Sequence, residues 1–246
     1  MPIDQKTYIR DVYSKAWIAS RHNMTEVGDY NRSLCSLIQH LVPRDSRLCE
    51  VAIGTGWPIA DYLQRHGYRV SGVDIAPNLI DRCKQINQNI AAKVGDAENL
   101  EYPSASFDCV YCFHSTWYIP HLLDALEEML RVCKPHGLVL FDILNMSNKK
   151  TARAYKKHVF RQTPSLLGKG LRYVSNTGRQ LRGQEPDWDF VIFWTPTYPR
   201  KIFEFISRNH IKEARVYGVI DPEPIQLDRS ADHNDFRRLL FVLVKT

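Results

Sequence analysis

Two apolar runs joined by a loop of small residues limit the fold of this chain more than any other feature. The first run contains Glu50 and leads into the small-residue loop 52–56, and the second run, 68–73, ends in Asp74. Small residues let a backbone approach a ligand closely, and an acid at the tip of a strand can accept hydrogen bonds from both hydroxyls of a ribose. Strand, loop, helix, strand and acid, with about twenty residues between loop and acid, form the layout of a nucleoside-binding βαβ unit.

The loop does not suit a dinucleotide. A dinucleotide site normally has a third glycine, which packs the helix on the strand and brings its amino end to the pyrophosphate. Here Gly54 and Gly56 are followed by Trp57 with no further glycine nearby, so a pyrophosphate would be crowded. Glu50 would repel a phosphate but attract an ammonium group. The sequence therefore favours an adenosine-containing cofactor that carries an ammonium group.

Three later segments resemble the class I S-adenosylmethionine-dependent methyltransferases. Residues 94–100 are similar to the third strand of that family and the acid after it, 106–112 to the fourth strand, and 129–140 to the helix end, turn and fifth strand. Two positions depart from the family pattern. Ala52 stands where the first loop glycine is common, and His136 stands where the turn usually supplies a glycine.

The resemblance implies an α/β fold with a Rossmann-like, seven-stranded and mostly parallel sheet, helices on both faces and the last strand antiparallel. One domain spans 1–246, and the match covers 45–145, the cofactor-binding core. Residues 1–44 would form an N-terminal helical lid. Residues 146–195 would form a basic insert on the substrate side after strand five, and residues 196–246 a C-terminal helix with strands. Hydrophobic periodicity predicts strands at 47–53, 68–74, 92–95, 107–113, 137–144, 189–194, 214–218 and 236–244, and helices at 57–66, 77–89, 121–133, 148–160 and 195–210.

By the same resemblance, the cofactor would be held at the carboxyl ends of the strands. Asp74 would take the ribose hydroxyls, Ile75 would pack on the adenine, and Asp96 with the Ala97 amide would meet the adenine's polar edge. The methionine part would be held by Glu50, Ala52, Gly54, Gly56 and main-chain groups around Phe113. Another interpretation of Asp74 is a helix N-cap. The cofactor role is favoured because Asp74 and Asp96 both end strands at one edge of the sheet.

The candidate catalytic residue is His114, directly after the fourth strand. Methyl transfer mainly needs alignment, and an oxygen acceptor also needs a base with a pKa near neutral. A histidine hydrogen-bonded to the backbone is an equally good interpretation of His114. Trp117 and Tyr118 would wall an acceptor pocket or cover the sheet edge, and His121 begins the next helix. Tyr13 belongs to a helical aromatic stripe, for which core packing is favoured over a lid role.

The basic residues are concentrated in one segment. The net charge is +6, yet no acid occurs between Asp142 and Glu185, where ten Lys and Arg residues fall; elsewhere 23 basic residues face 27 acidic ones. This composition fits a solvated surface, recognition of an anionic small acceptor (a metabolite, glycan or lipid intermediate), nucleic acid, or anionic lipid. Nucleic acid is disfavoured because the remainder is slightly acidic and no acceptor clamp of the Asn-Pro-Pro-Tyr kind follows strand four.

Cysteine usage favours a reduced, cytoplasmic protein, since the six cysteines lie on predicted strands and helices. Cys109 and Cys112 with His114 suggest a metal site, but a strand points those two thiols to opposite faces. No metal is therefore expected. No apolar run is long enough to cross a bilayer, and the first residues lack the pattern of a signal peptide.

The leading hypothesis is methyl transfer from S-adenosylmethionine to a small-molecule acceptor, at oxygen in preference to nitrogen or carbon. The alternatives are an RNA methyltransferase and a non-catalytic, cofactor-binding regulatory module. A nicotinamide dehydrogenase fits least, because the loop after Gly56 is crowded.

Overall fold

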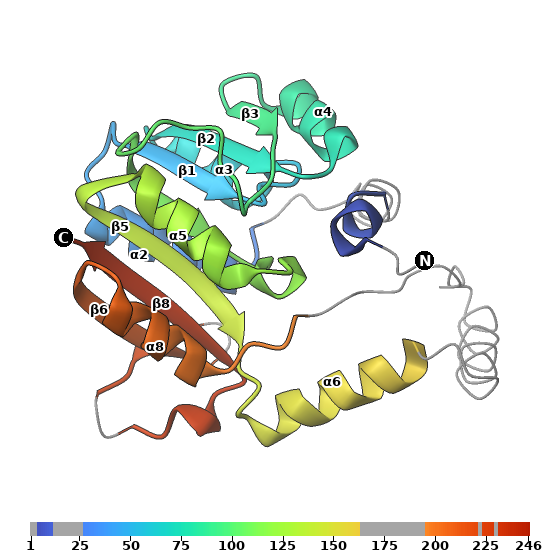
Figure 1. The fold of residues 1–246 in the computed structure, drawn as a ribbon. Coiled ribbons are helices and arrows are strands. Elements are labelled where there is room, and N and C mark those ends of the chain that lie inside the picture. The colour runs from blue at the N-terminus through green and yellow to red at the C-terminus, as the bar shows by residue number, and fades with distance from the viewer. Residues whose placement is uncertain (1–3, 12–26, 163–194, 221–222, 229–230) are drawn as a thin grey trace.

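The computed structural model describes residues 4–11, 27–162, 195–220, 223–228 and 231–246 (Figure 1). Three expectations lie outside these residues and stay predictions: the lid role of Tyr13, the strand at 189–194, and the structure of the insert beyond 162.

The strands form a single eight-stranded sheet in the order β3-β2-β1-β4-β5-β8-β6-β7. The first five strands pair in parallel, and β8 runs antiparallel to β5 and β6, as the sequence predicts. The expected count of seven strands is wrong by one, because β7 extends the edge beyond β6. It was missed because it is four residues long and contains Pro224, which weakens a strand pattern. The strands are β1 (Arg47–Val51), β2 (Arg69–Asp74), β3 (Ala91–Val94), β4 (Phe107–Cys112), β5 (Cys133–Leu144), β6 (Ile211–Ile220), β7 (Glu223–Gln226) and β8 (Arg238–Lys245).

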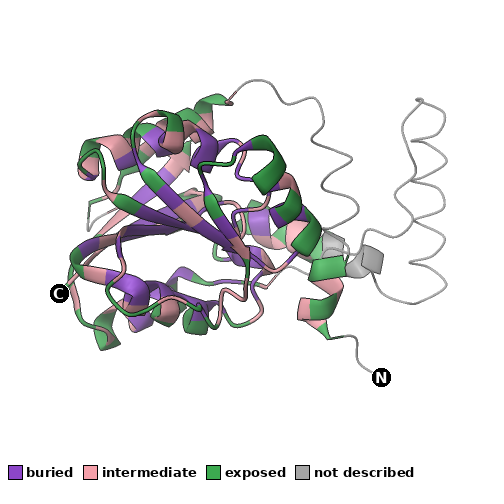
Figure 2. Cartoon of the chain, turned by 90° about the horizontal axis from the view of Figure 1, so that it is seen from above, coloured by how far each residue is buried: buried purple, intermediate pink, exposed green. Residues whose placement is uncertain are grey.

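Helices cover both faces of the sheet, as expected for this alternation (Figures 1 and 2). Apolar side chains of α2, α3 and α4 pack on one face, and those of α5 and α8 pack on the other. The basic helix α6 extends from the end of β5 away from the sheet (Figure 1). The helices are α2 (Asp29–Leu41), α3 (Ile59–Arg65), α4 (Pro77–Ile86), α5 (Leu122–Val132), α6 (Lys149–Gln162) and α8 (Pro199–Arg208), and residues 5–11 are also helical.

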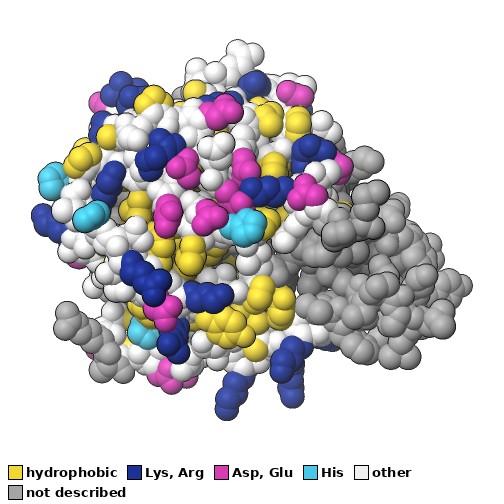
Figure 3. All heavy atoms as spheres, in the orientation of Figure 1, with side chains coloured by type: hydrophobic (Ala, Val, Ile, Leu, Met, Phe, Trp, Pro, Cys, Tyr) yellow, Lys and Arg dark blue, Asp and Glu magenta, His cyan; other side chains and the backbone are white. Residues whose placement is uncertain are grey.

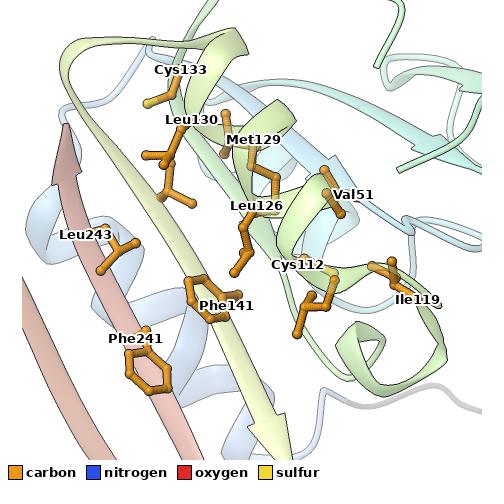
Figure 4. Packing of buried hydrophobic residues seen from close by; sticks show 14 of the residues in the cluster. Val51, Cys112, Ile119, Leu126, Met129, Leu130, Cys133, Phe141, Phe241 and Leu243 are labelled. Atoms are coloured by element: carbon orange, nitrogen blue, oxygen red, sulfur yellow. The ribbon is translucent and has the colours of Figure 1, made fainter. Parts of the chain in front are cut away.

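Strand alternation explains how one sheet serves two cores. In β4, Cys109 and Tyr111 belong to the core under α2 and α3, whereas Cys112 belongs to the core under α5. The two thiols therefore point to opposite faces, and all six cysteines are free and buried. In the core under α5, the rings of Phe141 and Phe241 from adjacent strands stack with centroids 5.2 Å apart (Figure 4).

The two departures from the family's glycine pattern adopt the backbone conformation that glycine would favour. Ala52 has φ 59° and His136 has φ 61°, both in the left-handed region. A side chain there crowds the following carbonyl, which costs about 1–2 kcal/mol per residue. Both turns therefore retain the backbone conformation of the family's glycine-containing turns, at the cost of local backbone strain.

Candidate functional site

A cavity at the carboxyl ends of β1, β2 and β4, here called the main cavity, brings most of the predicted site residues together. Two are not in its lining. Gly56, at φ 77°, packs its backbone close to the Cys83 sulfur, and Trp117 is buried beside the sheet. The predicted residues that line it are Glu50, Ala52, Gly54, Asp74, Ile75, Asp96, Ala97, Phe113, His114 and Tyr118.

Asp74 organises the loop that borders the main cavity. Its Oδ2 accepts a hydrogen bond from the Gly54 N–H at 2.8 Å, and its Oδ1 accepts one from the Ala76 N–H at 2.9 Å. Helix α4 has Ala76 as its N-cap and no side-chain cap bond, so Asp74 is not the N-cap. Burial raises the pKa of the Asp74 carboxyl, and the backbone donors counteract this rise. Each carboxylate oxygen has a further lone pair for a ligand.

Glu50 places a buried carboxyl group at the floor of the main cavity. The Tyr111 hydroxyl donates a hydrogen bond to its Oε2 at 3.2 Å. Among the residues that the structure describes, no basic side chain forms an ion pair with it. Burial raises the pKa of Glu50 to about 8. A buried acid without a counter-charge is costly, and a ligand ammonium group would supply that charge.

Trp57 contributes a hydrogen-bond donor that the sequence did not assign to the site. The residue lines the main cavity, and its buried indole Nε1–H has no acceptor among the described residues. A buried donor is normally paired, so a ligand acceptor such as a carboxylate is a suitable partner. Trp57 was interpreted only as a block to a pyrophosphate.

The N-terminal helix, residues 5–11, contributes to the lining of the main cavity. Lys6 and Ile9 line it, and Lys6 Nζ lies 2.6 Å from Asp96 Oδ2 and 2.5 Å from Glu98 Oε2. Burial raises the pKa of Glu98, but hydrogen bonds from Lys6 and His121 bring it below its ordinary value. Lys6 was not predicted, since a lysine on a short helix gives no sign of a partner ninety residues away.

His114 also lines the main cavity, among residues from distant parts of the chain. Its backbone has φ 60°, and its N–H donates to Asp142 Oδ1 at 2.8 Å. Ring atom Nε2 lies 2.8 Å from Asn31 Oδ1. Asn31 has no sequence signal, but Asp142 is a single acid inside an apolar run and could have been found. His121, expected to begin the next helix, is the N-cap residue of α5, and its ring atom Nδ1 lies 2.9 Å from Glu98 Oε2.

Beside His114 lies a second hollow, here called the basic groove, between the first turn of α6 and the start of β8. Its lining includes Lys149, Lys150, Arg237 and Arg238. Of these, Lys149, Lys150 and Arg237 form no side-chain hydrogen bond or ion pair within the described part of the chain. Figure 3 shows Lys and Arg side chains at the lower edge of the molecule, where Figure 1 places α6. Acidic Asp232 and Asp235 also line the groove, so its charge is mixed but mainly positive.

Comparison with known proteins agrees with this geometry. Residues 49–141 match the model of a methyltransferase domain family. This match, with the sheet order and the cavity at the carboxyl edge of the sheet, identifies residues 49–141 as a class I S-adenosylmethionine-dependent methyltransferase domain. Its cofactor is accordingly S-adenosylmethionine.

Relatives share different lengths with the chain. A malonyl-[acyl-carrier protein] O-methyltransferase of Erwinia pyrifoliae is 28% identical over 192 residues, covering 77% of this chain and 73% of that protein. A ubiquinone/menaquinone biosynthesis C-methyltransferase of Pseudomonas savastanoi is 33% identical over 108 residues, and the chain spans only 42% of its length. A solved structure from Pyrococcus horikoshii matches the fold with a TM-score of 0.64 and 16% identity, covering 96% of this chain and 99% of that one.

Within the described residues, the structure contains no helix with the length and apolar character needed to span a membrane.

Proposed function

We propose that the chain transfers a methyl group from S-adenosylmethionine to a hydroxyl group of a small anionic acceptor. The observation that carries this proposal is the position of His114, which lines the main cavity and lies next to the basic groove through Arg238. A nucleophile held at His114 could extend its anionic part towards Lys149 and Lys150. The O-methyltransferase among the relatives supports oxygen as the acceptor atom, and the C-methyltransferase makes carbon the outcome to exclude.

The residues around the main cavity fit the chemistry of the cofactor. Glu50 would pair with the methionine ammonium group, Trp57 Nε1–H would donate to the methionine carboxylate, and Asp74 would accept from the ribose hydroxyls. Ile75 would pack on the adenine, and Asp96 with Ala97 would meet its polar edge. The bound cofactor supplies an electrophilic methyl group on a sulfonium. The protein's part is then to align the acceptor and to remove its proton.

The N-terminal helix would act as a lid over the adenine end of the main cavity. Lys6 and Ile9 line the cavity, and the ion pairs of Lys6 with Asp96 and Glu98 hold this helix against it. Lys6 and the adenine would both face the Asp96 carboxylate. The contact of the lid with Asp96 and the contact of the cofactor with Asp96 would therefore influence each other.

Cofactor binding is tested by calorimetry with S-adenosylhomocysteine on the native chain, Asp74→Ala and the control Asp81→Ala. Asp81 is an exposed acid on α4, so its removal should leave affinity unchanged. Asp74→Ala should weaken binding about tenfold or more, since hydrogen bonds to a charged group contribute about 1.5–3 kcal/mol each. Equal affinity of all three proteins would remove Asp74 from the cofactor site.

The acceptor class is tested with methyl-labelled cofactor and matched acceptors: hydroxylated carboxylates or phosphates and their neutral esters. Label should enter the anionic member of each pair as an O-methyl group. The double variant Lys149→Gln/Lys150→Gln should lose about tenfold in kcat/KM with the anionic acceptor and little with the neutral one. Lys84→Gln, an exposed lysine on α4, serves as the control.

Three outcomes of the labelling experiment would replace the proposal. Label in RNA, with binding that weakens steeply in salt, would favour an RNA methyltransferase. A C-methyl product would move the acceptor atom to carbon. Tight cofactor binding without transfer to any acceptor class would favour the regulatory module.

A further inference from the structure

The ring of His114 is held in one defined tautomer. Its Nδ1 lies 3.3 Å from Nη1 of Arg238, and its Nε2 lies 2.8 Å from Oδ1 of Asn31. A guanidinium has only donors, so Nδ1 must accept this hydrogen bond. The carbonyl oxygen of Asn31 accepts, so Nε2 must carry the hydrogen. In this neutral form, Nδ1 is the nitrogen that can take up a proton.

Asp142 faces the same nitrogen from inside the sheet. Its side chain is fully buried on β5, and Oδ1 accepts the His114 backbone N–H. Oδ2 accepts no hydrogen bond among the described residues, although it lies 3.9 Å from His114 Nδ1 and 3.6 Å from Arg238 Nε. A buried carboxylate is tolerated when opposite charge is close, and among the described residues Arg238 is the only permanent positive charge within 4 Å of Asp142.

Arg238 connects His114 with the basic groove. Its guanidinium carbon lies 5.0 Å from the Tyr30 ring centroid and 5.4 Å from that of Trp117, within the range of cation–π contacts. The same residue lines the basic groove. An anion in the groove would therefore meet a guanidinium that also contacts Nδ1 of His114.

We propose that Asp142 and Arg238 are positioning residues that set the basicity of His114 in opposite directions, and that an anionic acceptor draws Arg238 away from Nδ1. This rests on the proposed function. The acceptor oxygen then loses its proton to Nδ1 and forms its bond to the methyl carbon, while the C–S bond electrons return to the sulfur as a neutral thioether. The imidazolium that results keeps its Nε2–H on Asn31 and turns its new Nδ1–H towards Asp142 Oδ2.

The direction of each effect follows from charge. Tyr30 from α2, Asp142 from β5 and Arg238 from β8 are titratable or charged groups that contact the ring. A carboxylate this close favours the imidazolium, and a guanidinium disfavours it, each by about one pH unit or more. Asp142→Asn should therefore lower the pKa of His114, and Arg238→Gln should raise it.

The test is an NMR titration of the His114 imidazole protons, assigned by their loss in His114→Gln. It is run on the native chain, Asp142→Asn, Arg238→Gln and the control Arg237→Gln, which removes the same charge from the neighbouring exposed position. The pKa of His114 should shift in opposite directions in Asp142→Asn and Arg238→Gln. In the control it should stay within a few tenths of a pH unit of the native value. Thermal unfolding and S-adenosylhomocysteine binding identify variants that fail to fold, and Asp142→Ser then replaces Asp142→Asn.

A second arm adds inorganic phosphate as the anionic probe. Phosphate should raise the pKa of His114 in the native chain and leave it unchanged in Arg238→Gln. Shifts of the same sign in both folded variants, or none, would overturn the opposed roles of Asp142 and Arg238. If phosphate shifts the pKa of His114 equally in the native chain and in Arg238→Gln, an anion does not act by drawing Arg238 away from Nδ1, and that part of the proposal is overturned. None of these measurements needs an acceptor or turnover, so they can fail or succeed independently of the proposed methyl transfer.

Discussion

Replacement of Glu50 by glutamine is expected to stabilise the unliganded protein near neutral pH and to weaken cofactor binding at the same time. The carboxyl group is buried at the cavity floor and has no basic partner among the described side chains, so burial raises its pKa to about 8. Glutamine has nearly the same shape and can still accept the hydrogen bond of Tyr111, but it has no charge to bury and no charge to offer an ammonium group.

The size of the effect follows from the difference in proton binding. The ordinary pKa of the Glu50 carboxyl is 4.5, and in the folded protein it is about 8. At a pH between these two values, Glu50 has released its proton in the unfolded chain but still holds it in the folded protein. Stability therefore falls as the pH rises through this window. At about 1.4 kcal/mol per pH unit, the cost reaches at most about 3 kcal/mol at pH 7 and stays below about 1 kcal/mol at pH 5.

Urea unfolding of the native chain and Glu50→Gln at these two pH values measures the difference. The matched control is Glu128→Gln. Hydrogen bonds and charge from Arg131 lower the pKa of Glu128, so the same substitution there should destabilise the protein at pH 7. The reasoning is refuted if Glu50→Gln is no more stable than the native chain at pH 7, or if the difference between them is the same at pH 5.

Three further predictions concern single properties of the chain. Binding of S-adenosylhomocysteine at pH 7 should release up to about one proton from Glu50; calorimetry in buffers of different ionisation enthalpy detects it, and equal heats in all buffers would contradict it. His136→Gly should stabilise the protein by up to about 1 kcal/mol relative to His136→Ala, because only glycine relieves the φ of 61°; equal unfolding midpoints would argue against strain. Burial raises the pKa of the Cys83 thiol to about 11, so a thiol reagent should modify the native chain slowly and reach all six cysteines only after denaturation; rapid labelling of the native chain would show that a thiol is accessible.

That the proposed cofactor-binding residues gather at one cavity could be predicted from the sequence, because their signals are local. Apolar runs that contain Glu50, end in Asp74 or precede Asp96 identify strands, and the carboxyl ends of parallel strands meet at one edge of a sheet. The structure places these three residues in the lining of one cavity. The five parallel strands were predicted within a few residues of their observed bounds for the same reason, since buried parallel strands read as apolar runs.

On the proposed acceptor side, the sequence indicated His114, Trp117 and Tyr118, but it could not predict the residues around the His114 ring, because they are far apart in the chain and carry no common pattern. Asn31 reaches His114 across 83 positions, and Arg238 reaches it across 124. An asparagine on an amphipathic helix and an arginine at the start of a strand are usually solvated, so neither spacing nor type sets them apart. Only Asp142 had a signal, as an acid within a buried apolar strand.

This division coincides with the limits of the family match. Residues 49–141 supply Glu50 and Asp74, whereas Asn31, Asp142 and Arg238 all lie outside that range. The residues around the candidate base therefore lie outside the matched segment, and Glu50 and Asp74, which are proposed to hold the cofactor, lie within it. If acceptor choice is built this way, exchanging residues of α2 or the start of β8 should change which acceptor is used without changing S-adenosylhomocysteine affinity. Altering the loop around Gly54 should change S-adenosylhomocysteine affinity, and its effect on activity should be the same for every acceptor.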